Sequence, residues 1–113
     1  MSYALLTSAE LQSHIAEWQR ELGSVRRLAD RTLSAYLSDL GQFLTFLSGH
    51  TGGGVGMATL KTLRAADIRA FLASRRNDNI GSRSLARELS AIKSFFGFLE
   101  REGILASEAL ATI

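Results

Sequence analysis

The stretch SRSLARELSAIKSFFGFLEREG, residues 82–103, decides the fold that this sequence predicts. Its apolar side chains recur every three or four residues, which places them on one stripe of an α-helix. That stripe comprises Leu85, Leu89, Ile92, Phe96 and Leu99. The opposite stripe carries arginine and serine, at Arg83, Arg87, Ser90, Ser94 and Arg101. The acids Glu88 and Glu100 lie off it. We therefore expect a long amphipathic helix whose polar side carries little negative charge.

The composition favours a single all-α domain. The chain has 113 residues, of which 46% are hydrophobic, and no proline, the residue that most strongly interrupts helices. It also has no cysteine, which excludes disulfides and thiolate metal ligands. No apolar run approaches the roughly 20 residues that span a bilayer, and the N-terminus lacks signal-peptide features. We expect a cytoplasmic protein in which residues 1–113 are one domain, with about 8–110 folded.

The first predicted helix opens where Thr7 and Glu10 have the spacing of a capping box. It runs to about Leu22, and Gly23 is placed to end it. Its core-facing stripe is Leu11, Ile15, Trp18 and Leu22.

Two more helices are predicted before residue 82. Asp30 is placed to cap a long one over residues 31–49, and a glycine-rich flexible loop follows. A shorter one covers residues 62–78 and turns Arg69, Arg75 and Arg76 outward. With residues 82–103, and with a short fifth helix over 104–113, the expected architecture is a compact bundle of four to five helices.

The helix that begins at Asp30 also has an unusual polar stripe, formed by Arg31, Ser34, Ser38, Gln42 and Thr45. Asp39 is rotated well off its centre. Short hydroxyl side chains let a helix approach another surface closely, and they can hydrogen-bond phosphates or bases. The cations are eleven arginines and two lysines, and the guanidinium fork suits phosphate oxygens. Two polar stripes low in acids indicate a binding surface for a polyanion, with DNA as the first candidate. The alternatives are an ordinary solvent-facing surface and a protein-interaction bundle.

Catalytic and metal-binding patterns are absent from the sequence. The glycine-rich segment lacks the Gly-Lys-Ser/Thr ending of a phosphate-binding loop, and no predicted strand precedes it. His14, on the outer side of the first helix, and His50, in the loop, have no second ligand at helical spacing. We therefore expect no cofactor, no metal, no small-molecule substrate and no catalytic residue in this chain.

Two segments carry a resemblance to a known family. They are T-L-x-A-Y-x-x-D-L-x-x-F-x-x-F-L at Thr32 to Leu47 and A-R-x-L-S-A-I-K-x-F-F-x-F-L at Ala86 to Leu99, with D-I-R-A-F-L between them. With these segments in this order, the chain resembles the N-terminal core-binding, SAM-like domain of tyrosine recombinases of the XerC/XerD type. These recombinases are relatives of the phage and lambda integrases. The resemblance covers roughly residues 8–110.

The resemblance implies a fold and a function. In this family the helices pack as two crossed pairs, and the second and fourth helices of the domain face the major groove of a recombination half-site. A separate C-terminal domain carries the nucleophilic tyrosine, and four protomers assemble on two sites. Implied partners are therefore double-stranded DNA and other recombinase protomers on it.

The resemblance also implies individual DNA contacts. Arg87 and Lys93 match positions that contact the DNA backbone, and Arg83 and Ser84 match positions that reach phosphates and base edges. Thr32 matches a threonine near the start of the second helix, whose DNA-facing side Arg31, Ser34 and Ser38 extend. With the serines of the fourth-helix stripe, the predicted DNA-binding residues are Arg31, Thr32, Ser34, Ser38, Arg83, Ser84, Arg87, Ser90, Lys93 and Ser94.

The sequence departs from the family pattern in two respects. The segment HTGGGVGMATL is richer in glycine than the usual connector, and the chain stops at Ile113, where the family continues into its catalytic domain. We expect a piece of a longer recombinase, with a stand-alone domain as the alternative. The rival functions are a helical protein-interaction module that binds through Phe46, Phe98 and the last helix, and a self-sufficient nuclease or lyase. The target sequence is left open, as is the choice between chromosome dimer resolution and phage or mobile-element integration.

Overall fold

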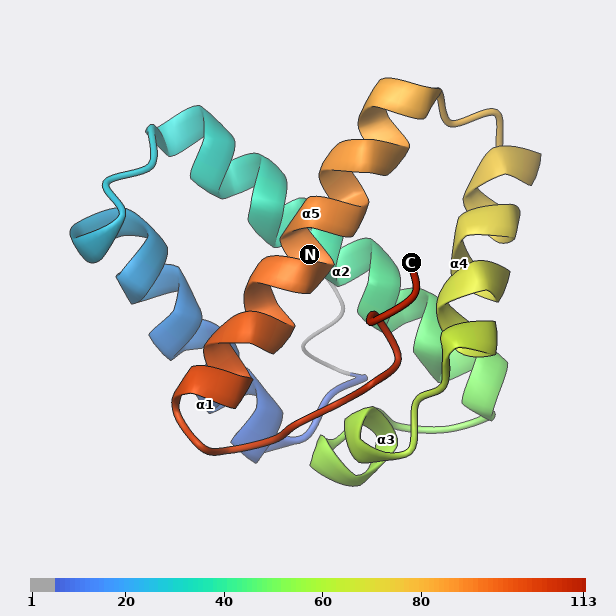
Figure 1. Cartoon of the computed structure of the whole chain (residues 1–113), viewed down its shortest axis with the longest axis horizontal. Helices are drawn as coiled ribbons and strands as arrows, with labels where there is room; N and C mark the ends of the chain where they lie inside the picture. The colour runs from blue at the N-terminus through green and yellow to red at the C-terminus, as the bar shows by residue number, and fades with distance from the viewer. Residues whose placement is uncertain (1–5) are drawn as a thin grey trace.

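Five α-helices make up most of residues 6–113, the part of the chain that this computed structural model describes (Figure 1). They are α1 (Ala9–Arg20), α2 (Asp30–Thr51), α3 (Met57–Lys61), α4 (Ala65–Asn77) and α5 (Ser82–Arg101). A π-helical turn, η2 (Glu21–Val25), extends α1. Within these residues there is no strand, only an isolated bridge between Thr7 and Val55. The predicted all-α class is confirmed.

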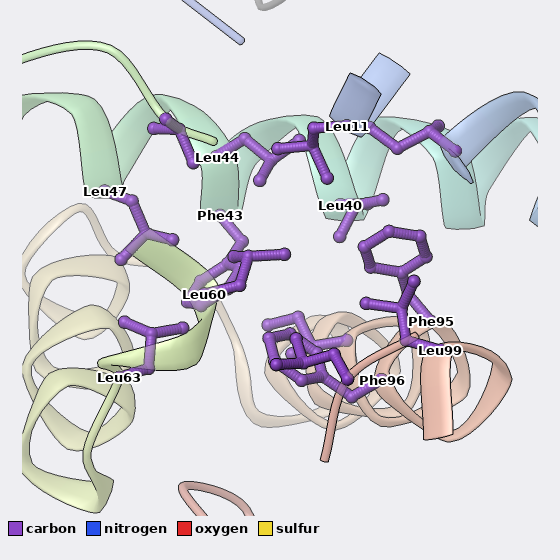
Figure 2. Close-up of a cluster of buried hydrophobic side chains, with 14 of the residues drawn as sticks. Leu11, Leu40, Phe43, Leu44, Leu47, Leu60, Leu63, Phe95, Phe96 and Leu99 are labelled. Carbon is purple, nitrogen blue, oxygen red and sulfur yellow. The ribbon is translucent and has the colours of Figure 1, made fainter. Parts of the chain in front are cut away.

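The two long helices, α2 and α5, pack against each other and cross near their middles (Figure 1). Their apolar stripes face each other at the crossing, where the ring of Phe43 lies edge-on to Phe96 at 6.5 Å and to Phe71 of α4 at 5.2 Å. Figure 2 shows side chains of α2 and α5 converging from opposite sides, with Leu60 and Leu63 beside them. The apolar periodicity of the two helices therefore places the core as predicted.

Helix α1 is fixed to α5 through Trp18. The Trp18 side chain is completely buried, and its ring lies edge-on to Phe95 at 5.3 Å. The indole Nε1 donates a hydrogen bond to the Ser94 hydroxyl at 3.1 Å. A buried tryptophan needs such a partner for its N–H group, so Ser94 completes the packing of α1 on α5.

Both predicted ends of the first helix are wrong in detail. Ser8, not Thr7, is the N-cap, and its hydroxyl accepts the backbone N–H of Leu11 at 3.1 Å. Gly23 does not end the helix, which continues through the π-helical turn to Val25. The left-handed residue after it is Arg27, with φ 54°. Sequence spacing favoured a glycine stop, whereas burial of Leu22 keeps the chain helical past that point.

The glycine-rich segment is not the plain flexible loop that composition predicts. Helix α2 runs on to Thr51 and ends at Gly52, whose φ of 80° suits glycine. Val55 is then buried, and its N–H donates to the Leu6 carbonyl at 2.7 Å. The short helix α3 follows, so the helix predicted over 62–78 begins only at Ala65. The buried Val55 and helix α3 hold in place a segment that its glycine content predicted to be flexible.

The chain after α5 differs from its prediction too. Residues 104–113 are irregular, with a turn at 109–112, rather than a fifth helix, and Leu105 and Ala109 are buried against the core. The described residues still contain five α-helices, because the unpredicted helix α3 makes up for the predicted helix over 104–113 that does not form.

The carboxylate of Asp67 joins the start of α4 to the end of α2. Its Oδ2 accepts the backbone N–H of Arg64 at 2.8 Å, and its Oδ1 lies 2.9 Å from Nε2 of His50, which is in the last turn of α2 and not in the loop. These contacts, the bond from Arg64 foremost, lower the pKa of Asp67 below its ordinary value of 3.8.

We expect the Asp67 contacts to make stability depend on acid pH. A lowered pKa in the folded state means that ionised Asp67 stabilises the fold above pH 4 or so, and that this contribution is lost as the pH falls through the lowered value. Asp67→Ala should reduce the free energy of unfolding by about 1 kcal/mol at pH 7, and its deficit should shrink in acid. Urea denaturation from pH 7 downward measures this. Glu10→Ala, at an exposed first-turn acid of α1, is the control; an equal and pH-independent loss in both variants would contradict the prediction.

Candidate nucleic-acid interface

The predicted DNA-binding residues of α2 lie in its N-terminal half and are exposed. They are Arg31, Thr32, Ser34 and Ser38. Those in the N-terminal half of α5 are Arg83 and Ser90, which are exposed, Ser84, which is half-buried, and Arg87. In Figure 1 these two half-helices diverge from the crossing toward the same edge of the molecule. We call these eight residues the crossing face.

Arg87 and Asp39 connect the two helices at this face. The Arg87 guanidinium donates from Nε to Oδ2 and from Nη2 to Oδ1 of Asp39, both at 2.8 Å. The Asp39 side chain is only 3% exposed, while that of Arg87 is 48% exposed. The hydrogen bonds to Asp39 raise the pKa of Arg87. On the helical wheel Asp39 lies off the polar stripe, and this position does not reveal that it is the buried partner of Arg87.

A second arginine–carboxylate pair joins α4 to the other side of α5. Arg75 donates from Nε and Nη2 to the two carboxylate oxygens of Glu88, at 2.9 and 3.0 Å. Both side chains are largely buried, at 17% and 3% exposed. The prediction that Arg75 points outward is wrong, because Glu88 lies on the packed side of α5 and its buried carboxylate requires a cation.

The remaining two predicted residues have partners inside the domain. The Lys93 ammonium is exposed but donates to the Ile113 carbonyl at 3.0 Å. Ser94 is half-buried and accepts the Trp18 indole N–H. Eight of the ten predicted residues therefore lie on the N-terminal halves of α2 and α5, while Lys93 and Ser94 contact other parts of the fold.

Charge at the crossing face is dominated by arginine. The nearest buried carboxylates, Asp39 and Glu88, are each held by a guanidinium, so neither projects a free negative charge from between the helices. Within residues 6–113 no three His, Asp or Glu side chains are grouped so that they could hold a metal ion. None of the helices described is long and apolar enough to cross a membrane. What the face can offer chemically is hydrogen-bond donors and positive charge.

The comparisons with known proteins define the class. Residues 15–103 match the family model described as phage integrase, N-terminal SAM-like domain, and the chain belongs to that family. Among curated proteins it is 43% identical over 104 residues to the tyrosine recombinase XerC of Mesorhizobium japonicum, covering 92% of this chain and 33% of that protein.

Two further relatives bear the same name. The chain is 44% identical over 97 residues to the tyrosine recombinase XerC of Brucella suis, covering 86% of this chain and 31% of the relative. It is 44% identical over 110 residues to the tyrosine recombinase XerC of Bradyrhizobium diazoefficiens, covering 96% of this chain and 34% of the relative. The chain thus spans about a third of the length of these relatives. No solved structure matches it significantly.

Proposed function

We propose that this chain is the part of a site-specific tyrosine recombinase that binds one half-site of a recombination sequence, through the crossing face of α2 and α5. The observation that carries the proposal is that two helices with acid-poor polar stripes cross, and that the pair of Arg87 and Asp39 joins them beside those stripes. Membership of the integrase family supports the same reading.

Arginine and hydroxyl groups would have different tasks in such a complex. The guanidinium groups of Arg31, Arg83 and Arg87 would contact phosphates, which supply most of the affinity and make it depend on salt. The hydroxyls of Thr32, Ser34, Ser38, Ser84 and Ser90 would allow close approach and hydrogen-bond the backbone or base edges.

The recombination chemistry would reside in the two thirds of the relatives that this chain does not span. There a tyrosine would attack the scissile phosphate and hold the strand as a phosphotyrosyl intermediate. Other protomers would be bound to the same DNA, and the protein would act in the cytoplasm. For this chain we propose binding alone, without cleavage or rejoining.

The alternative of a protein-interaction module has less support, because one of its two phenylalanines is buried and the other is half-buried and packed against the fold. Phe98 is buried, at 4% exposed, and Phe46 stacks on His50 and packs against Phe71. Among the large apolar side chains of residues 6–113, Val25 is the exposed one. A partner protein would find little apolar surface here, so DNA binding is the better-supported function.

Salt-titrated fluorescence anisotropy tests the proposal. The chain is titrated onto a palindromic recombination-site duplex and onto a random duplex of equal length, from low to physiological salt. We expect Arg31→Ala and Arg83→Ala each to weaken binding and to lower the slope of log K against log salt by about 0.9. Arg69→Ala, which removes an exposed arginine from α4, is the control of equal charge. If all three variants behave alike, the crossing face is not the binding surface.

A further inference from the structure

We propose that Asp39 is a positioning residue for DNA binding, which holds the guanidinium of Arg87 so that its free edge projects from the crossing face toward a phosphate. This inference rests on the proposed function and adds to it a residue that does not itself touch DNA. It also assigns a purpose to a carboxylate that would otherwise oppose a polyanion.

The geometry of the pair separates the two edges of the guanidinium. The two carboxylate oxygens of Asp39 accept one hydrogen bond from Nε and one from Nη2, each at 2.8 Å. The other terminal nitrogen, Nη1, is not used in this contact. Because the Asp39 side chain is 3% exposed and that of Arg87 is 48% exposed, nearly all the accessible surface of the pair belongs to Arg87, whose Nη1 is available to a phosphate.

Fixing the arginine in advance favours binding. A free arginine side chain loses rotational freedom about several bonds when it contacts a phosphate, and this entropic cost weakens the complex. In this fold the loss has already occurred when Asp39 and Arg87 pair, so the contact to phosphate comes at a smaller further cost. The pair also bridges α2 and α5, so it fixes Arg87 relative to both helices.

The second pair of this fold shows what a purely structural contact looks like. Glu88 holds Arg75 through the same two nitrogens, at 2.9 and 3.0 Å, but Arg75 is 17% exposed and extends from α4 to the packed side of α5. It has no part in the crossing face. The two pairs therefore match in chemistry and differ in whether the arginine is presented to solvent.

Positioning and net charge predict opposite results when the acid is removed. Removal of a carboxylate raises the net charge by one, and this alone strengthens binding to DNA. If Asp39 positions Arg87, its removal weakens binding instead. Asp39→Asn and Glu88→Gln make the same change in charge, and each removes a buried carboxylate that holds one arginine, so they are a matched comparison.

The experiment compares these variants on the palindromic recombination-site duplex at physiological salt, at a temperature where circular dichroism shows each to be folded. We expect the Kd of Asp39→Asn to rise about 3- to 10-fold, and that of Glu88→Gln to stay within about 2-fold of the parent or to fall. If Asp39→Asn binds as tightly as Glu88→Gln, or more tightly than the parent, the positioning role is overturned while the proposed function stands.

Two further outcomes are distinguished by the same experiment. If the parent chain does not bind the duplex even at low salt, the proposed function fails, and the inference fails with it. If Asp39→Asn does not fold, Arg87→Lys replaces it, because lysine keeps the charge but lacks the fork. Its Kd is expected to rise about 3- to 10-fold with the salt slope unchanged, and parent-like binding would overturn the proposal.

Discussion

Arg75→Ala is expected to lower the free energy of unfolding by about 3–5 kcal/mol, the cost of leaving a buried carboxylate without its cation. Glu88 is 3% exposed and receives two hydrogen bonds from Arg75. Without them its charge would have to be desolvated alone or neutralised by protonation. Urea denaturation at neutral pH measures the loss. Arg76→Ala, at the exposed neighbouring arginine of α4, should change stability by less than about 0.5 kcal/mol.

A double variant shows whether the loss comes from the orphaned charge. Arg75→Met combined with Glu88→Leu removes both charges and keeps apolar volume, so most of the stability lost in Arg75→Ala should return. If Arg75→Ala costs no more than Arg76→Ala, the pair is an ordinary surface ion pair, and our description of Glu88 as a buried group that needs a cation is wrong.

Trp18→Ala is expected to cost about 3–5 kcal/mol of stability, the usual penalty for removing a large aromatic side chain from a core. The side chain is fully buried, and it lies against Phe95 and bonds Ser94. Ser94→Ala keeps the packing and removes only the hydrogen-bond acceptor, so it should cost about 1–2 kcal/mol. Thermal or urea unfolding of both variants separates the two contributions. Equal losses would mean that the hydrogen bond, not ring packing, attaches α1 to α5.

Much of this fold follows from apolar periodicity. The stripes of α2 and α5 are long enough that their core positions, such as Leu40, Phe43 and Ile92, can be assigned from spacing alone, and all three are buried. The ends of the helices depend on which of several neighbouring residues caps the helix, and the predicted ends were less accurate than the predicted core. Ser8 and Thr7 are both common N-cap types, and the Glu at the capping-box spacing from Thr7 favoured the residue that the fold does not use. The short helix α3 has too few residues to show an apolar periodicity, so the sequence pattern did not predict it.

The exposed residues of the crossing face were predictable, whereas its ion pairs were not. Arg31 and Ser38 lie opposite a clear apolar stripe, so their exposure follows from the helical wheel. Asp39 and Glu88 lie between the apolar and polar stripes, where a wheel does not say whether a side chain is buried. The partners of these acids are 48 and 13 residues away in sequence, and only the packing of α2, α4 and α5 brings them together. The same holds for Ser94, whose partner Trp18 is 76 residues away.

The most direct test of the central claim is to map the DNA-contacting residues by amide chemical-shift perturbation. A 12.3 kDa chain is well suited to NMR, and a recombination-site duplex can be titrated into the labelled protein at physiological salt. We expect the largest changes in the N-terminal halves of α2 and α5, at residues such as Ser34, Ser38, Arg83 and Ser90. Changes confined to α1 and the outer side of α4, with the crossing face unperturbed, would contradict this expectation.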